Sequence, residues 1–96
     1  MNCEYMPYKV FVSRTFQKKF HKIQKNIQKS IRITLKELEE DPFTSRANCD
    51  IKLLKDTKLK KYRLRIGDYR AIYLVENYDV KIIDLIKREV GYNRLE

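Results

Sequence analysis

One hairpin motif most constrains how this chain can fold. From residue 60 onward, apolar and basic side chains alternate as far as Gly67-Asp68, and Tyr69, Ala71, Tyr73 and Val75 continue the apolar face on the return strand. Strict alternation indicates strands with one apolar face. A two-residue turn that begins with glycine is typical of a type II′ hairpin. The sequence therefore predicts two antiparallel strands joined at Gly67-Asp68.

The register of this hairpin predicts a pair of facing arginines. If Gly67-Asp68 are the loop residues, Ile66 pairs with Tyr69 and Arg65 pairs with Arg70. Both arginines then lie on the face turned away from the core. Like charges in directly opposite positions destabilise a sheet, and an anion that bridges the two guanidiniums would offset this cost. A solvated polar face is the alternative interpretation of the same pattern.

The first half of the chain predicts one strand and two helices. Residues 8–12 are rich in β-formers, and Ser13 can cap a helix that follows. Apolar residues then recur at helical spacing from Phe16 to Leu38. We expect a helical hairpin broken near Asn26 rather than one long helix. Asp41-Pro42 ends the helical region, because the residue before a proline disfavours helix.

The second half adds a loop over residues 43–50, the hairpin, a turn over residues 76–79 and a last strand over residues 80–86. The predicted fold is α+β, in the order β-α-α-β-β-β, with two helices packed on one face of a mostly antiparallel four-stranded sheet. We expect the 96 residues, 1–96, to form a single domain. No apolar segment resembles a signal peptide or a membrane span, so we expect a cytoplasmic protein with no membrane contact.

Charge narrows the choice of partner. The formal net charge is +9, which favours a polyanion such as nucleic acid, an acidic protein or an anionic membrane surface. Several lysines of the first helical region would suit a membrane surface: Lys18, Lys19, Lys22, Lys25 and Lys29. A helix that packs its apolar side on the sheet and leaves these lysines in solvent is the better explanation of the pattern than membrane binding.

The sequence contains few residues that could bind a metal or a cofactor. His21 is the only histidine, so neither a histidine pair for acid–base catalysis nor a metal site can be built on it. Cys3 and Cys49 are far apart and lack neighbouring ligands, so we expect two incidental thiols. We expect no metal and no cofactor.

Basic residues gather around the predicted hairpin. The residues that we expect to bind RNA are Lys58, Lys60, Lys61, Arg63 and Lys87. An antiparallel meander can also bring Arg88 and Tyr92 beside the arginine pair. Guanidinium groups bind phosphate through two parallel hydrogen bonds, and tyrosine can stack on a base. The set therefore favours an RNA interface, and no motif typical of DNA-binding domains is present.

The segment Lys61-Tyr-Arg-Leu-Arg-Ile-Gly-Asp-Tyr-Arg-Ala-Ile-Tyr73, followed by a hydrophobic strand and Lys87-Arg-Glu-Val-Gly-Tyr92, resembles the signature of the RelE/ParE toxin superfamily. The resemblance covers nearly the whole chain. It implies the catalytic residues Arg65, Arg70, Arg88 and Tyr92. Arg63 matches a second basic residue on the strand before the turn. Gly91 departs from the family's pattern, in which the tyrosine directly follows Arg-Glu-Val.

The resemblance implies the toxin component of a type II toxin–antitoxin system. A RelE-type toxin is a metal-free, ribosome-dependent endoribonuclease that cleaves mRNA in the A site, inhibits translation and is neutralised by an acidic, RelB-like antitoxin. The general base would be Tyr92 or a lysine such as Lys60, because nearby guanidiniums lower the pKa of either group. Two rival functions stay open: a ParE-like toxin that inhibits gyrase, and an RNA- or ribosome-binding module without catalysis.

Overall fold

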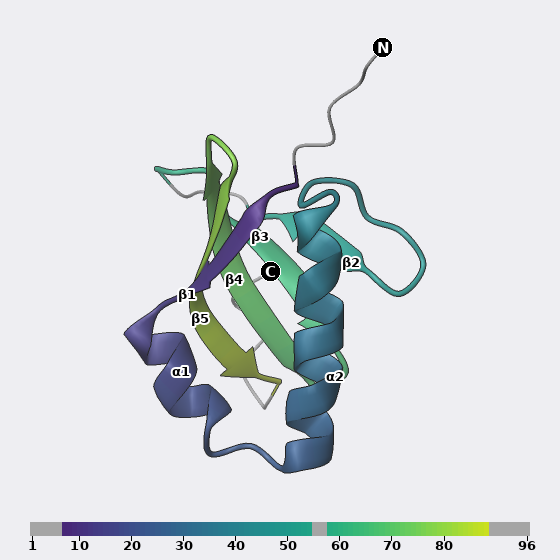
Figure 1. The fold of residues 1–96 in the computed structure, drawn as a ribbon, viewed down its shortest axis with the longest axis vertical. Helices are drawn as coiled ribbons and strands as arrows, with labels where there is room; N and C mark the ends of the chain where they lie inside the picture. The colour runs from purple at the N-terminus through teal and green to yellow at the C-terminus, as the bar shows by residue number, and fades with distance from the viewer. Residues whose placement is uncertain (1–6, 55–57, 89–96) are drawn as a thin grey trace.

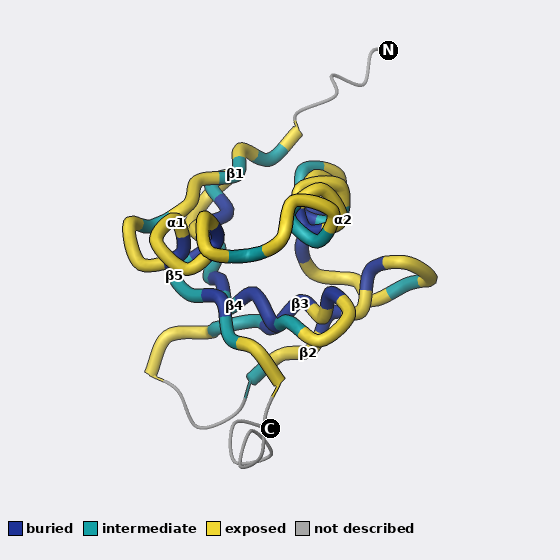
Figure 2. Tube along the Cα trace, turned by 90° about the horizontal axis from the view of Figure 1, so that it is seen from below, coloured by how far each residue is buried: buried dark blue, intermediate teal, exposed yellow. Residues whose placement is uncertain are grey.

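The computed structural model describes residues 7–54 and 58–88. Its elements, in chain order, are β1 (Lys9–Val12), α1 (Arg14–Phe20), α2 (Lys25–Lys36), the 3-10 helix η1 (Glu37–Glu39), β2 (Asp50–Leu53), β3 (Tyr62–Ile66), β4 (Tyr69–Glu76) and β5 (Asp79–Lys87). Both α-helices lie on the same face of one sheet (Figures 1 and 2). The expected α+β class is confirmed.

The sheet has five strands in the order β1-β5-β4-β3-β2. β1 runs parallel to β5, and the other neighbours are antiparallel. The predicted four-stranded sheet was therefore wrong by one strand, because β2 was expected to be part of a connection. β2 is only four residues long and buries a single side chain, Ile51, so its sequence shows too few alternations to indicate a strand.

The helical hairpin is confirmed, and the break falls at residues 21–24, just before Asn26. Ser13 caps α1 as expected: its Oγ accepts a hydrogen bond from the backbone N–H of Phe16 at 3.0 Å and donates to the carbonyl of Ile83 at 2.9 Å. The cap thereby also fixes α1 to β5. Over the described ranges, no helix is long and apolar enough to cross a membrane.

The helical region ends where the proline motif predicts. The backbone N–H groups of Phe43 and Thr44 both donate to Oδ1 of Asp41, at 2.8 and 3.1 Å. These bonds form a local turn around Pro42 and hold the pKa of the Asp41 carboxyl below its ordinary value, with Phe43 the largest cause.

The core lies between the helices and the sheet. Its buried side chains come from both α-helices, from η1 and from strands β2 to β5, and they include Ile31, Leu38, Leu64, Tyr73 and Ile82. Figure 2 shows this buried layer between the two helices and the strands. The face of the sheet turned away from the helices is the one on which the predicted arginine pair lies.

Both predicted turns are present. Gly67 has φ 58°, and Asp68 does not share a positive φ, which is the pattern of a type II′ turn. At the second turn Glu76 pairs with Asp79, and Asn77 adopts φ 55°. Asparagine tolerates this left-handed conformation better than most residues. The turns therefore fix the register of β3 with β4, and of β4 with β5 as far as a register shift, where Tyr73 pairs with Ile82 but Ile72 pairs with Asp84.

Candidate nucleic-acid interface

The predicted arginine pair is confirmed by the strand register. Arg65 of β3 lies directly opposite Arg70 of β4, and Arg63 lies opposite Ile72. Leu64 and Ala71, which alternate with these residues, are fully buried in the core against the helices. The three arginines therefore share the outer face of the sheet, which we call the arginine face.

The three arginines differ sharply in exposure. Arg65 is exposed, whereas Arg63 retains 7% and Arg70 only 3% of its accessible surface. Nη1 of Arg70 donates to the carbonyl of Tyr69 at 3.3 Å. Buried arginines are normally paired and contribute packing as well as charge. Arg65 is therefore the accessible member of the facing pair, and Arg70 is held in place beneath the surface.

β2 adds two residues to this face that the sequence did not identify as part of it. Asp50 pairs with Arg65 and Lys52 pairs with Arg63 in the β2–β3 register. Oδ1 of Asp50 lies 3.6 Å from Nη1 of Arg63. One carboxylate therefore offsets part of the positive charge next to the arginine pair. Asp50 was missed because β2 was not predicted, and without β2 nothing places residue 50 opposite residue 65.

The end of β5 reaches the hairpin turn, as the meander order predicted. Ile86 pairs with Arg70, Lys87 pairs with Tyr69, and the backbone N–H of Arg88 donates to the carbonyl of Asp68 at 2.6 Å. The backbone of Arg88 is thereby fixed beside the turn. Strand alternation places the side chain of Lys87 on the helix side of the sheet, away from the arginine face. Tyr92 lies outside the described residues.

The remaining lysines lie at the other end of β3. Lys58 and Lys60 are exposed and Lys61 is half-buried, just before β3 begins. The carbonyl of Lys61 accepts a hydrogen bond from the backbone N–H of Leu54 at 2.9 Å. Lys61 is four residues before Arg65, or about 13 Å along an extended strand. These lysines lengthen the basic surface and do not join the cluster around the facing arginines.

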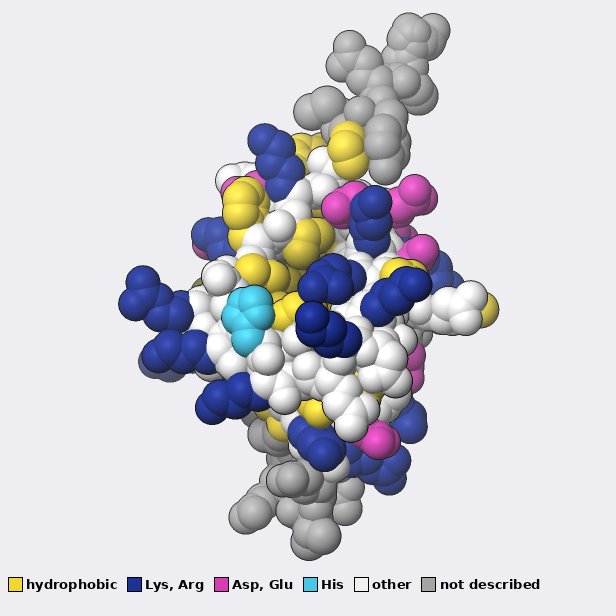
Figure 3. Space-filling view, turned by 60° about the horizontal axis from the view of Figure 1, so that its bottom comes forward, with side chains coloured by type: hydrophobic (Ala, Val, Ile, Leu, Met, Phe, Trp, Pro, Cys, Tyr) yellow, Lys and Arg dark blue, Asp and Glu magenta, His cyan; other side chains and the backbone are white. Residues whose placement is uncertain are grey.

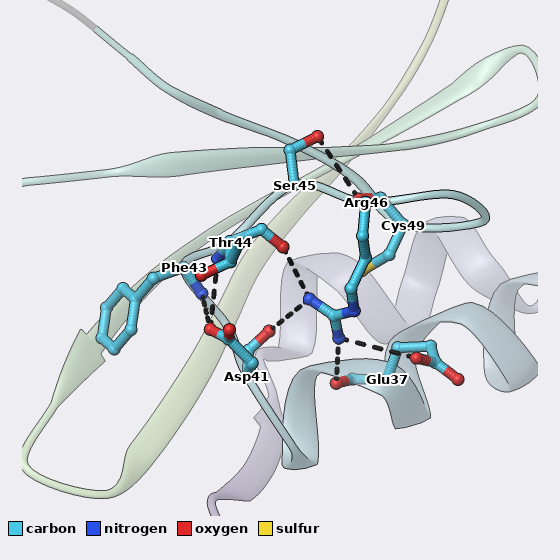
Figure 4. Close-up of polar contacts among 7 residues, drawn as sticks. All are labelled: Glu37, Asp41, Phe43, Thr44, Ser45, Arg46 and Cys49. Atoms are coloured by element: carbon cyan, nitrogen blue, oxygen red, sulfur yellow. Dashed lines mark hydrogen bonds and ion pairs between the residues drawn. The ribbon is translucent and has the colours of Figure 1, made fainter.

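Another arginine has a structural role that the sequence did not indicate. The guanidinium of Arg46 donates to the carbonyls of Thr44, Glu37 and Asp41 at 2.6, 2.9 and 3.1 Å, and it lies 3.5 Å from the Glu37 carboxylate (Figure 4). The Glu37 carbonyl also accepts from the backbone N–H groups of Glu40 and Asp41, at 3.1 and 3.4 Å. Arg46 adds a donor to it and to two carbonyls that follow η1, and thereby fixes the loop before β2 to the end of the helical region.

Tyr73 is not available as an acid or base. Its ring is fully buried, and its hydroxyl donates to the carbonyl of Pro42 at 2.7 Å. Burial is the main cause that raises the pKa of Tyr73 above its ordinary value. Within residues 7–54 and 58–88, no group of three His, Cys, Asp or Glu side chains is arranged to hold a metal ion.

Comparison with known families gives one match over most of the chain. The model of a family described as the ParE toxin of the type II toxin–antitoxin system parDE matches residues 10–92. This range contains every described element except the first residue of β1. A search of curated proteins gives no match.

Solved structures share the fold. A chain of the archaeal RelE–RelB complex from Pyrococcus horikoshii is 30% identical, with a TM-score of 0.74 over 86% of this chain and 97% of that chain. A chain of the intact E. coli RelBE complex is 26% identical, with a TM-score of 0.64 over 85% and 98%. The Mycobacterium tuberculosis RelBE2 complex, at 22% identity and a TM-score of 0.71 over 85% and 99%, supports the fold alone.

Proposed function

The chain belongs to the RelE/ParE superfamily of toxins of type II toxin–antitoxin systems, and from this premise we propose that it is a metal-independent endoribonuclease that cleaves mRNA in the ribosomal A site. Such cleavage would inhibit translation. We further propose that the reaction takes place in the cytoplasm and that an acidic, RelB-like antitoxin neutralises it. Two of the similar solved structures are RelE–RelB or RelBE complexes at 26–30% identity, which supports an antitoxin partner.

The observation that carries this proposal is the facing pair of arginines. Arg65 and Arg70 occupy opposite positions on β3 and β4, and the backbone of Arg88 is held at the adjoining turn. Cleavage by the ribose 2′-hydroxyl passes through a phosphorane that carries extra negative charge. Donors fixed in position before the reaction stabilise such charge most effectively. Arg65 is the exposed group able to meet the phosphate, and Arg88 is exposed next to the adjoining turn.

The geometry also bears on the general base. Lys60 precedes Arg65 by five residues, or about 16 Å along an extended chain. A phosphate bound at the arginine pair would therefore lie nearer to the end of β5, where Ile86 pairs with Arg70, than to Lys60. We assign the base to Tyr92, with the guanidiniums favouring its phenolate form. We assign Lys58, Lys60 and Lys61 to binding of RNA farther along β3.

A ParE-like function is the second candidate, because the matching family model carries that description. A toxin of this kind would inhibit DNA gyrase and would not cut RNA. The fold and the hairpin would serve either function. The full set of arginines is what favours the nuclease, since a protein that only binds gyrase would not need a phosphorane site.

Primer extension on ribosome-bound mRNA tests the proposal. The wild-type protein is expected to cut within the A-site codon, and Arg65→Ala is expected to abolish the cut. Arg14→Ala, an exposed arginine on α1 outside the arginine face, is the matched control and is expected to cut normally. Intact mRNA with the wild-type protein would reject the nuclease. A gyrase supercoiling assay would then test the ParE-like function, and binding of ribosomes without either activity would indicate a non-catalytic module.

A further inference from the structure

A second basic site lies on the helix side of the sheet. A pocket of about 400 Å³ opens between the α1–α2 connection and the end of β5. Its lining includes Lys19 and Lys22 from the helical region, Lys87 and Leu85 from β5, and Tyr69 from β4. Figure 3 shows Lys and Arg side chains spread over the side of the molecule that carries the helices. This pocket lies on the opposite side of the sheet from the arginine face and is a separate site.

The charge of the pocket is positive. Nζ of Lys19 lies 2.7 Å from Oδ1 of Asp84, and this carboxylate oxygen also accepts a hydrogen bond from the backbone N–H of Leu85 at 2.7 Å. The Lys19 charge is therefore offset by a fixed carboxylate. Lys22 and Lys87 are both exposed, and no acidic residue is among the described residues that line the pocket. Two ammonium groups with no ion pair to a carboxylate of the described residues favour an anionic ligand.

The backbone that carries Lys22 is fixed before any ligand binds. Its N–H donates to the carbonyl of Lys19 at 3.2 Å. The side-chain amide of Gln28 donates to the carbonyls of Phe20 and Ile23, at 3.0 and 2.9 Å, on either side of Lys22. A fixed backbone lowers the entropy that is lost when a ligand orders the lysine. The connection between the helices is thus a rigid support for a binding group.

The pocket and the arginine face meet at the same end of the sheet. Tyr69 and Lys87, which line the pocket, are register partners, and the next pair along the strands is Arg70 with Ile86. Side chains of successive residues point to opposite faces. The two basic sites therefore lie on opposite faces of the sheet, at the level of neighbouring residue pairs of β4 and β5. A ligand strand on the arginine face that continues around the end of β5 would reach the pocket next.

We propose that the α1–β5 pocket binds a phosphate group of an RNA strand whose neighbouring segment lies on the arginine face. Lys22 and Lys87 supply the charge, and Tyr69 supplies an aromatic wall for the attached nucleoside. The volume is within the range of about 300–1,000 Å³ that is usual for ligand sites. This inference rests on the proposed RNA function.

A matched pair of double variants tests the pocket. Lys22→Gln with Lys87→Gln removes these two ammonium charges. Lys25→Gln with Lys29→Gln removes two exposed lysines of α2 that do not line it, so both proteins lose the same net charge. The affinity for a short single-stranded RNA is measured by fluorescence anisotropy over a salt series. Thermal unfolding of both variants confirms that they are folded.

The pocket variant is expected to show a smaller slope of log affinity against log salt, by about 0.7 for each phosphate group that the protein no longer binds. The control variant is expected to keep the wild-type slope. Equal slopes for the two variants would overturn the pocket inference and leave the proposed function standing. Failure of the wild-type protein to bind RNA at all would instead overturn the proposed function.

A second measurement identifies the source of the anion. Inorganic phosphate is titrated into the protein, and the backbone amide shifts of Lys22, Tyr69 and Lys87 are followed by NMR. We expect shifts at these residues, and we expect the short RNA to displace the phosphate. Phosphate that RNA does not displace would overturn the proposal and indicate a site for a free anion. Loss of affinity for polyglutamate in the pocket variant, with RNA binding unchanged, would overturn it in favour of an acidic protein partner.

Discussion

Arg65 and Arg70 lie directly opposite each other on β3 and β4, yet Arg65 is exposed and Arg70 retains only 3% of its accessible surface. The two residues carry the same charge at the same level of the hairpin. Their different surroundings give them different roles. Arg65 can exchange water for a phosphate group, whereas Arg70 supports the sheet from a fixed position.

The stability of alanine variants should separate these two roles. Arg65→Ala is expected to change the free energy of unfolding by less than about 0.5 kcal/mol, as is usual for surface substitutions. Arg70→Ala removes a buried side chain and is expected to lower the free energy of unfolding by about 2 kcal/mol. Urea denaturation measures both values. Equal losses in the two variants would show that exposure does not separate their roles.

Arg88→Ala should abolish most cleavage without unfolding the protein. The backbone N–H that donates to Asp68 is kept by alanine, so the end of β5 stays attached to the turn. Loss of one group that stabilises transition-state charge typically lowers the rate about 100-fold or more. Arg88→Lys is the companion variant and is expected to retain part of the rate, because lysine keeps the charge but not the planar donor geometry. Single-turnover cleavage rates give the comparison, and a fully active Arg88→Ala would remove this residue from the site.

Tyr73 should govern part of the stability at alkaline pH. Burial raises the pKa of Tyr73 in the folded protein above its ordinary value of 10.0, so the unfolded chain loses the phenolic proton first. The contribution of the neutral phenol is therefore fully present below pH 10 and falls as the pH rises above it. This loss approaches about 1.4 kcal/mol per pH unit for one group.

Tyr73→Phe provides the test of this titration. At neutral pH the variant loses the hydrogen bond to Pro42 and leaves a buried carbonyl, which is expected to cost about 1–2 kcal/mol. Above pH 10 the difference between wild type and variant is expected to shrink, because phenylalanine does not ionise. Denaturation curves at several pH values measure the difference. A constant difference would show that Tyr73 keeps an ordinary pKa.

Arg46→Ala should destabilise the protein and spare the RNA site. The variant leaves the carbonyls of Glu37, Asp41 and Thr44 without their guanidinium donor. Hydrogen bonds of this kind are each worth about 1 kcal/mol, so we expect a loss of about 2–3 kcal/mol in total. Cleavage per folded molecule is expected to stay at the wild-type level. Reduced cleavage at a temperature where the variant is fully folded would extend the site to the loop before β2.

The hairpin was predictable because its determinants are local. A glycine that begins a two-residue turn fixes the register, and the register alone places Arg65 opposite Arg70. Ser13 and Pro42 act on their own neighbours in the chain, so the helix boundaries followed as well. The family resemblance, which rests on the same hairpin, was confirmed by the match over residues 10–92.

Other features depend on contacts between distant segments, which no local pattern contains. β2 exists because Asp50 to Leu53 find partners on β3, and its own sequence has only one buried position. The burial of Arg70 was not predictable either, because alternation predicts only which face the residue occupies. Arg46 similarly acts on carbonyls that the helix end presents to it in space.

The parallel pairing of β1 with β5 has a consequence for how the toxin is made. β1 cannot be incorporated into the sheet until β5 has been synthesised, and the hydrogen bond from Ser13 to Ile83 spans 70 residues. Contacts this remote in sequence form late and slowly. A nascent chain that already carries the β3–β4 hairpin would therefore still lack the support of a closed sheet. Synthesis of the chain would be nearly complete before the toxin could take up its folded form.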